Sequence, residues 1–403
     1  MRSAVHSDRS GRVYVSADYS AAAFDGASLV PLSEALPLPP GAELVPVPRE
    51  AEALDRAGRP RGLGRSRWAL AALLPRGHTR TLLPAYRDEG GEDIAPLPYA
   101  AVAADAGGEL VVAALRSGTP DAARPEPAAV EDAVKRALRA WPSSRLVRQL
   151  ARCAREYGCA GARSALLGRG EAALPMAAPA NERPATVLAL HSDRDARPAE
   201  PATFSPVPDE IADVAAAHLA EGGDAVAFGR ACEGEPLLSI RVLEQAVRLI
   251  RERTDRGRIV LETNGSSPAA LRRAIEAGVD EVVVRLASAR AATYELLHGP
   301  QGYRWTDVRA SLAYAAERRG RLRLALLVLP GLTDRPGEVE ALLALLGDLP
   351  GGAIELRDLG ADPLRALALA PSTERPVGVR ATLVRLAREA SHFPHDASIG
   401  AAA

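Results

Sequence analysis

The chain has 403 residues, of which 47% are hydrophobic and only 4% aromatic, and its formal net charge is −1. This length allows two or three domains, or one barrel with an appendage. A charged fraction of 25% is typical of a folded globular protein. The near-neutral charge gives no electrostatic reason to expect nucleic acid or a membrane as a partner. The cysteines, Cys153, Cys159 and Cys232, are too few for a disulfide framework.

Two further features bear on the origin of the chain and its compartment. Lys135 is the only lysine among 50 basic residues, a bias that indicates a GC-rich bacterial genome. The N-terminus has no apolar stretch typical of a secretory signal. The most apolar run, Leu322 to Leu329, is far shorter than the roughly 20 residues that span a bilayer. We therefore expect a cytoplasmic protein.

Residues 1–125 predict a small β-rich domain. Short apolar runs alternate there with turns rich in proline and glycine. The runs 99–104 and 109–116 flank the sequence Asp-Ala-Gly-Gly, and this arrangement predicts a β-hairpin. Prolines inside other apolar runs restrict those strands to the edges and bulges of a sheet.

Residues 126–171 predict a helical connector. An apolar stripe at helical spacing is formed by Val130, Val134 and Leu138. The sequence Trp-Pro-Ser at 141–143 breaks this pattern, and we expect a second helix from Ser144 to Leu167. Cys153 and Cys159 would both lie on that helix. Because six residues turn a helix through about 600°, the two thiols should point to different sides of it.

Residues 172–365 predict an α/β domain of repeated strand–helix units. Candidate strands lie near 172 and at 225–228, 258–261, 281–286, 321–329 and 354–356. Strand–helix repeats with right-handed crossovers form a parallel sheet, whose functional face lies at the carboxyl ends of the strands. About six units predict a partial (β/α)6 TIM-like barrel, short of the eight strands of a full barrel. Residues 366–403 would add a C-terminal helix and a tail.

Polar and glycine-rich loops follow several of these candidate strands. They are residues 229–238, 262–266, 330–334 and 357–363. A single loop of this kind is explained equally well as an ordinary turn, because turns also favour Gly, Asn and Asp. Several such loops at one edge of the sheet favour a ligand-binding face.

Three short runs in these loops carry a family resemblance. Gly234-Glu235-Pro236 follows the second strand, Thr263-Asn264-Gly265-Ser266 the third, and Leu329 to Asp334 the fifth. They resemble, in this order, the GGEP-type motif, the loop near the cofactor ribose and the fifth-strand loop of radical S-adenosylmethionine (SAM) enzymes. The resemblance implies a barrel of radical-SAM type over residues 172–365. The cofactor contacts that it implies are Gly234, Glu235, Pro236, Thr263, Asn264, Gly265 and Arg357.

The sequence departs from this family at the cluster motif. Members carry CxxxCxxC just after the first strand, and its thiolates hold a [4Fe–4S] cluster that binds SAM. The resemblance aligns Ala180, Pro184 and Val187 with these cysteines, and no cysteine lies between Cys159 and Cys232. Because those three side chains cannot ligate iron, we expect no cluster and no resident cofactor, with SAM binding left open.

Further positions agree with the loss of the cluster. Arg285 and Ala287, at the end of the fourth strand, and Ala325, in the fifth, stand where the resemblance implies small polar cofactor contacts. Arg285 would bring a bulky cation to that place. A cluster built from the surviving cysteines would require an unusual fold, because only Cys232 belongs to the loops of the barrel.

Two polar segments could hold a metal site or an acid–base pair, or could be plain polar loops. A divalent metal could bind His191, Asp193 and Asp195, although Arg194 and Arg197 neutralise these acids. Glu233 and Glu235 could act as an acid–base pair, although nothing supplies a substrate. In both cases the plain loop is the favoured interpretation. His392 and His395 flank a proline and are interpreted as part of a surface tail.

The leading hypothesis is a degenerate radical-SAM-like pseudoenzyme. It would be a non-catalytic binding or scaffold partner of a protein, either an active homologue or a co-encoded protein. The alternative is an enzyme that still binds SAM or a related nucleotide at the barrel mouth through Glu235, Asn264 and Arg357. A third interpretation is that the cysteines were substituted deliberately, or that a non-standard cluster is built elsewhere.

Overall fold

The computed structural model describes most of the chain. The described residues are 2–87, 94–95, 97–118, 125–177, 179–183, 202–230, 233–318 and 321–398. Within them the structure consists of an antiparallel β region, three consecutive helices, a parallel α/β region and a C-terminal helix with a tail. None of the described helices is long and apolar enough to cross a membrane.

The N-terminal region is built from antiparallel strands. In the described residues, an eleven-stranded sheet runs in the order β4-β12-β11-β8-β1-β2-β6-β7, with β3, β5 and β10 attached beside this path, and β13 pairs with β9. The strands are β1 Ser3–Ser7, β2 Val13–Phe24, β3 Leu29–Pro31, β4 Leu36–Pro37, β5 Glu43–Glu50, β6 Glu52–Leu54, β7 Pro60–Gly62, β8 Trp68–Leu73, β9 His78–Arg80, β10 Leu83–Pro84, β11 Ala100–Ala104, β12 Leu110–Val112 and β13 Ala114–Arg116. The predicted hairpin is confirmed, because β11 and β12 pair antiparallel with Val102 opposite Val112.

The helical connector contains three helices instead of the two expected. They are α1 Pro127–Ala140, α2 Arg145–Glu156 and α3 Ala160–Leu167. The break at 141–143 is confirmed, and the Ser144 side chain accepts the Val147 N–H to cap α2. The single helix predicted from Ser144 to Leu167 is wrong. Gly158 adopts a φ of +68°, a left-handed conformation that ends helices, and Cys159 stands at the N-cap position of the next helix without a side-chain capping bond.

The α/β region contains a parallel half-barrel sheet. In the described part of the chain it has six strands in the order β14-β15-β16-β17-β18-β19. They are β14 Gly170–Ala173, β15 Gly223–Phe228, β16 Arg258–Thr263, β17 Glu281–Leu286, β18 Leu322–Val328 and β19 Ala353–Asp358. Each strand pairs in parallel with its neighbour. The prediction of an α/β protein with a parallel sheet is therefore confirmed.

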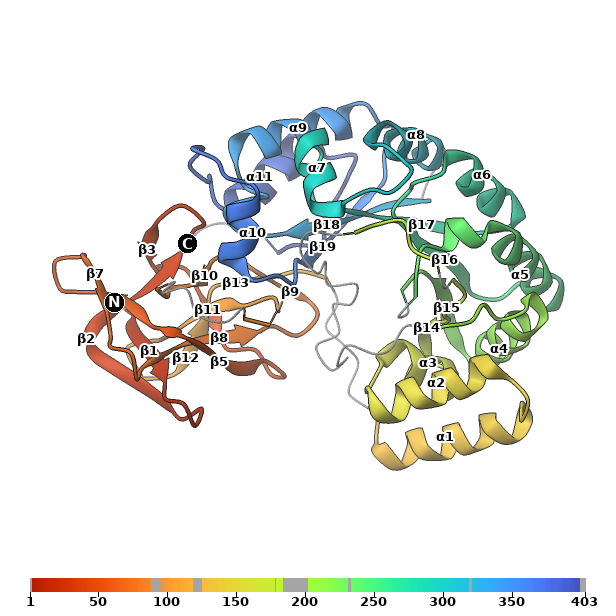
Figure 1. Ribbon diagram of the computed structural model, residues 1–403, viewed down its shortest axis with the longest axis horizontal. Helices are drawn as coiled ribbons and strands as arrows, with labels where there is room; N and C mark the ends of the chain where they lie inside the picture. Colours follow the sequence, from red (N-terminus) through yellow and green to blue (C-terminus); the bar gives the residue numbers. More distant parts are fainter. Residues whose placement is uncertain are drawn as a thin grey trace.

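Helices cover the outer face of this curved sheet (Figure 1). They are α4 Pro208–Glu221, α5 Ile240–Arg253, α6 Pro268–Ala277, α8 Trp305–Ala316, α9 Pro336–Gly347 and α11 Val379–Glu389. The 3₁₀ turn η1 Pro236–Ser239, α7 Ala291–His298 and α10 Pro363–Leu369 follow β15, β17 and β19 in the chain. Alternate strand residues face them, such as Ile259 and Leu261 of β16, and join the main hydrophobic core. The other set forms a separate small cluster on the concave face, consisting of Ala225, Ala227, Val260, Val283 and Ala325. Because successive side chains of a strand point to opposite faces, the sheet has one face packed against helices and one concave face.

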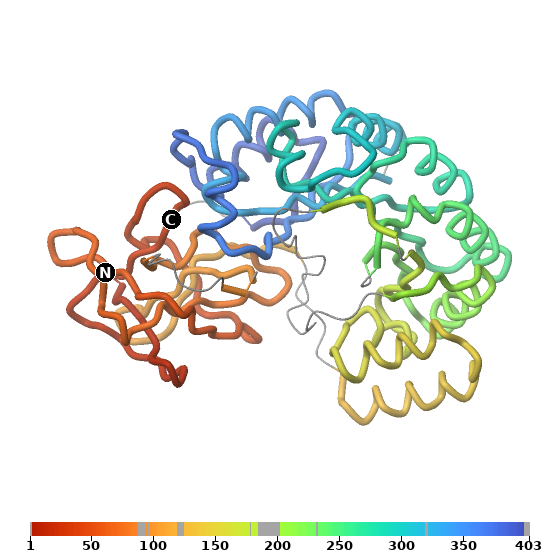
Figure 2. Tube along the Cα trace, in the orientation of Figure 1, coloured from red at the N-terminus to blue at the C-terminus, as the bar shows by residue number. Residues whose placement is uncertain are grey.

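The N-terminal sheet lies beside β19, and α1 to α3 lie at the opposite end of the parallel sheet beside β14 (Figures 1 and 2). The contact between the N-terminal sheet and β19 centres on Arg80 of β9, whose side chain is fully buried. Its guanidinium donates to the carbonyls of Tyr99 at 3.1 Å and Leu359 at 2.6 Å. It also lies 3.8 Å from the Asp358 carboxylate. One buried cation therefore joins the N-terminal sheet to the carboxyl end of β19.

A glycine pair makes a second close approach between the two regions. Gly26 follows β2 and Gly331 follows β18, and both have positive φ. A Cβ added to Gly26 would lie 2.1 Å from the Cα of Gly331. No side chain fits between the two backbones, so both loops depend on glycine here. The fifth-strand loop, which the sequence analysis assigned to a ligand-binding face, thus also packs against the N-terminal region.

We predict that Arg80→Met lowers the free energy of unfolding by about 3–5 kcal/mol, since it leaves buried acceptors and the Asp358 carboxylate without their cation. Urea denaturation of the full chain measures this loss. Arg56→Met is the matched control, because the Arg56 side chain is 90% exposed and its ion pair with Asp18 spans 3.8 Å. That substitution should change stability by less than about 0.5 kcal/mol. Equal denaturation midpoints for the two variants would refute the role assigned to Arg80.

Candidate functional site

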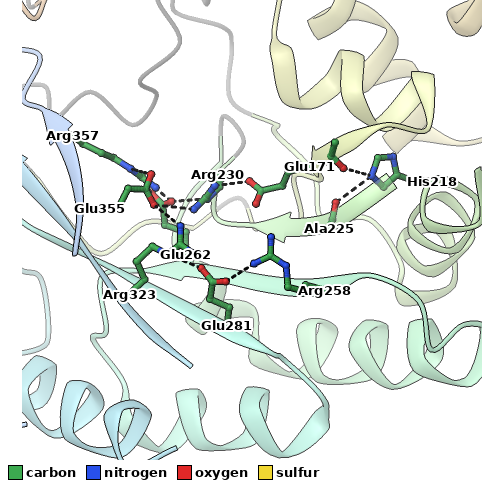
Figure 3. Close-up of polar contacts among 11 residues, drawn as sticks. Glu171, His218, Ala225, Arg230, Arg258, Glu262, Glu281, Arg323, Glu355 and Arg357 are labelled. Carbon is green, nitrogen blue, oxygen red and sulfur yellow. Dashed lines mark hydrogen bonds and ion pairs between the residues drawn. The ribbon is translucent and has the colours of Figure 1, made fainter. Parts of the chain in front are cut away.

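The concave face of the half-barrel carries a network of buried ion pairs (Figure 3). Glu262, at the end of β16, is fully buried. Its carboxylate accepts from Arg357 Nη1 at 2.8 and 2.9 Å and from Arg230 Nε at 3.0 Å. Arg230 also donates to Glu171 and Glu355, and Arg357 Nε donates to Glu355 at 2.8 Å. The network therefore connects strands at both edges of the sheet with its middle.

A second row of ion pairs lies nearer the amino ends of the strands (Figure 3). Glu281 of β17 pairs with Arg258 of β16 at 2.7 Å and with Arg323 of β18 at 2.9 Å. Arg323 continues to Glu355 at 3.6 Å. Acidic and basic side chains thus alternate from strand to strand, so that the concave face neutralises its own charge.

The pKa shifts follow from this pairing. Burial alone would raise the pKa of Glu355, but the charges of Arg357 and Arg230 lower it to about 2. The pKa of Glu262 is likewise lowered, because Arg357 and Arg230 outweigh the effect of burial. The pKa of Arg357 is raised, since the charges of Glu262 and Glu355 exceed its desolvation. All three side chains stay ionised near neutral pH, and Arg357, an expected cofactor contact, is engaged by protein carboxylates.

The structure brings together the other expected cofactor contacts. Gly234 N–H donates to Ala177 O at 2.7 Å, and Glu235 N–H donates to Pro179 O at 2.8 Å. The Glu235 carboxylate, 2% exposed, accepts from Thr263 Oγ1 at 2.5 Å and from the N–H of Asn264 at 2.9 Å. It also accepts the N–H of Leu237 and so caps the turn that begins at Pro236, while Gly265 follows at the same loop. Glu235 therefore links the second-strand and third-strand loops.

Glu233 has a comparable role at the ends of the first two strands. Its carboxylate accepts the backbone N–H groups of Met176 at 2.7 Å, Ala177 at 2.8 Å and Gly229 at 2.7 Å. Burial raises its pKa to about 7, and the neighbouring charge of Glu235 adds to this effect. Both carboxylates of the suggested acid–base pair are thus held by donors from neighbouring loops as well as their own.

The start of the expected cluster loop is fixed by backbone contacts. Arg183 N–H donates to Gly299 O at 2.9 Å, and Gln301 N–H donates to Asn181 O at 2.8 Å. The side chain of Asn264 donates to Asn181 Oδ1 at 2.8 Å. Ala180 lies exposed in this segment. The other expected cluster and metal positions lie outside the described residues; they are Pro184, Val187, His191, Asp193, Asp195 and Cys232.

Sequence reasoning missed a buried cluster around Glu182. Its Oε1 atom accepts from Tyr303 Oη at 3.0 Å and lies 3.1 Å from His298 Nδ1. His298 Nε2 accepts the Ala287 N–H, so the ring proton lies on Nδ1. Nδ1 therefore donates a hydrogen bond to the Glu182 carboxylate. Arg285 Nη2 lies 3.4 Å from the other carboxylate oxygen. The spacing of Tyr294 and His298, stacked at 4.1 Å, was the one signal in the sequence for a shared helix face.

Arg285 was expected to bring a cation to the mouth of the sheet, and it lies buried there at 7% exposure. Burial lowers its pKa, but the charges of Glu182, Glu262 and Glu235 raise it overall. Its Nε atom is buried and has no hydrogen-bond partner among the described residues, and the same holds for the hydroxyl of Ser266. Unpartnered buried donors are costly and point to water or a ligand as the missing partner.

No group of His, Cys, Asp and Glu suited to a metal ion is found in the residues that the structure describes. Neither Cys153 nor Cys159 forms a disulfide in the structure. Contrary to the expectation of different helix sides, they lie at one helix end, where Cys159 N–H donates to Cys153 O at 3.0 Å. The early helix break at Gly158 is the physical reason for this difference.

We predict that Glu182→Gln destabilises the protein near neutral pH by about 3 kcal/mol. Burial would raise the pKa of Glu182, but the hydrogen bond from His298 and the charge of Arg285 lower it to about 2. A carboxyl group with a lowered folded pKa stabilises the fold above its unfolded pKa of about 4.3, and this effect disappears as the pH falls towards 2. The difference in melting temperature between wild type and variant should therefore narrow as the pH is lowered from about 5 to 3.

The control for this measurement is Glu295→Gln, because Glu295 is exposed on the same helix as His298. Its melting temperature should follow that of the wild type over the whole pH range. A constant difference between wild type and Glu182→Gln would contradict the assigned ion pairing.

No protein-family model matches this chain, and no curated protein matches it either. TYW1 with a lysine-pyruvate adduct is similar at 12% identity and a TM-score of 0.38, over 56% of this chain and 74% of that one. A radical SAM methyltransferase from Sphaerobacter thermophilus has 18% identity and a TM-score of 0.35, over 48% and 57%. Methylornithine synthase (PylB) has 12% identity and a TM-score of 0.38, over 66% and 77%.

Similarities at these identities and TM-scores do not bear on activity, substrate or partners. Activity, substrate and partners are therefore inferred from the residues of this chain. The resemblance to radical SAM enzymes therefore rests on the short runs of the sequence at 234–236, 263–266 and 329–334.

Proposed function

We propose that this protein is a degenerate relative of radical SAM enzymes and acts as a non-catalytic binding or scaffold partner. It would keep the partial (β/α)6 TIM-like barrel and lack the [4Fe–4S] cluster. The observation that carries the proposal is the absence of any cysteine between Cys159 and Cys232 in the sequence. Thiolates are the ligands that such a cluster requires, so the residues present do not fit it.

The contacts at the start of the expected cluster loop support this proposal. Residues 181–183 are hydrogen-bonded to 299–301, and Pro179 is hydrogen-bonded to Glu235. Gly299 has a φ of +54°, and a Cβ there would lie 2.0 Å from the carbonyl oxygen of Arg183. The segment is thus tightly packed against its own chain.

The charges of the concave face also support it. Arg230, Arg357 and Glu262 satisfy one another, and Glu355 joins them. A ligand that used any of these groups would first have to break a buried ion pair, which costs several kcal/mol by order of magnitude. These residues are therefore better explained as parts of a self-neutralised interior than as a reaction centre.

The expected partner is an active homologue or a co-encoded protein. A cytoplasmic location is part of the proposal. The proposed domains are residues 1–125, 126–171, 172–365 and 366–403. The position of the N-terminal sheet against the carboxyl ends of β18 and β19 supports a non-catalytic role, because Arg80 and Leu83 of this chain occupy that end of the barrel.

Anaerobic reconstitution of the purified full chain with iron and sulfide tests the proposal. We expect no [4Fe–4S] absorption band beyond that of a Cys153→Ser, Cys159→Ser, Cys232→Ser control. No 5′-deoxyadenosine should form when SAM and a strong reductant are added. Because the control lacks every thiol, a signal shared by both proteins is adventitious iron. A band found only in the wild type, together with 5′-deoxyadenosine, would overturn the proposal.

A second candidate function is binding of SAM or a related nucleotide at the barrel mouth with non-radical chemistry. The unpartnered donors at Arg285 and Ser266 favour it, because both lie at the carboxyl ends of neighbouring strands. Calorimetric titration with SAM distinguishes the two functions. Scaffold function predicts no binding heat, whereas the second candidate predicts binding that is lost in Arg285→Met and kept in Arg323→Met, a control on the same face.

A further inference from the structure

The cysteines of the helical connector meet at the end of α2. This helix has its C-cap at Tyr157, and Gly158 follows in the left-handed conformation with a φ of +68°. Cys159 is the next residue, and its N–H donates to the carbonyl of Cys153 at 3.0 Å. In helix ends of this type, the side chain after the left-handed glycine packs on the residue three or four positions before the cap. Cys153 occupies that position.

The surroundings of the two thiols agree with this contact. Cys153 is 7% exposed within the main hydrophobic core, and the partly buried Cys159 packs against the same core. Burial raises the pKa of Cys153 to about 11, and the charge of Cys159 is the next largest cause. Gln149 Nε2 lies 3.5 Å from Cys153 Sγ. The backbone hydrogen bond between residues 159 and 153 thus places both cysteines at the same edge of the hydrophobic core.

We propose that Cys153 and Cys159 form a reversible intramolecular disulfide, which acts as a redox-sensitive staple across the turn between α2 and α3. A backbone hydrogen bond between two residues holds their Cα atoms at the separation that disulfides require.

The reaction needs a low-molecular-weight disulfide, such as glutathione disulfide, as the oxidant. The partly exposed Cys159 thiolate attacks one sulfur of it, forming a mixed disulfide and releasing one glutathione thiolate. Cys153, deprotonated, then attacks the Cys159 sulfur and releases the second glutathione. The two protein thiols lose two protons and two electrons, and the oxidant becomes two glutathione thiols.

The staple would act on the edge of the half-barrel. Directly after Cys159, α3 packs against β14 so closely that a Cβ on Gly161 would lie 2.4 Å from the Cβ of Ala173. Arg163 of α3 also donates to the carbonyl of Ala154 on α2 at 3.2 Å. Oxidation would therefore fix the end of α2 to the element that covers the first strand of the parallel sheet.

The test uses the full chain carrying Cys232→Ser, so that only this pair can react. After incubation with glutathione disulfide, we expect an intact mass lower by two hydrogen atoms, a peptide linking Cys153 to Cys159, and a raised melting temperature. Dithiothreitol should reverse all three changes. Adding Cys153→Ser should leave a stable glutathione adduct on Cys159, whereas adding Cys159→Ser should leave the buried Cys153 unmodified.

Two results would overturn the inference. One is a chain that keeps both thiols open to alkylation after oxidation. The other is a mixed disulfide on Cys159 that persists although Cys153 is present. Circular dichroism of each variant confirms that it is folded. Neither result depends on iron or SAM, so failure of the staple is distinguishable from failure of the proposed function.

Discussion

The buried ion pairs on the concave face are the constraint on which the half-barrel depends. Small side chains such as Ala225 and Val260 line the face beneath them and cannot fill the interior alone. Glu262 is fully buried and tolerable only because two guanidiniums surround it. A buried ion pair adds little net stability, but losing one partner leaves a charge in a low dielectric. The network therefore fixes the spacing of strands far apart in the sequence more than it strengthens the fold.

The same principle governs the junction with the N-terminal sheet. Arg80 places a cation among carbonyl oxygens at the carboxyl ends of β18 and β19, where a parallel sheet leaves its acceptors unpaired. Around it lies an apolar cluster that contains Leu83 from one region and Leu327 and Leu359 from the other. Together with the approach of Gly26 to Gly331, this junction places structural demands on loops that otherwise have the composition of a ligand-binding face.

Much of the fold could be predicted because the spacing of apolar residues along the sequence differs between the strands and the helices of the α/β region. The apolar pattern gives little signal for three helices of this region, since α4 is alanine-rich on all sides and α7 and α10 have only eight and seven residues. The proximity of Glu235 to Thr263 followed from the order of the loops. The pairing of Glu182 with His298 did not, because 116 residues separate them and a charged residue in isolation reads as solvated surface.

The fold constrains Glu235 far more than it constrains Ala180. The Glu235 carboxylate satisfies buried donors of Thr263, Asn264 and Leu237, so its removal would leave these groups unpaired whether or not a cofactor binds. Ala180, by contrast, is exposed, and folding places no demand on its side chain. Substitution of Glu235 is therefore costly to the fold, whereas position 180 is free to vary. The contacts of Glu235 are explained by folding alone, so its presence does not by itself indicate a bound cofactor.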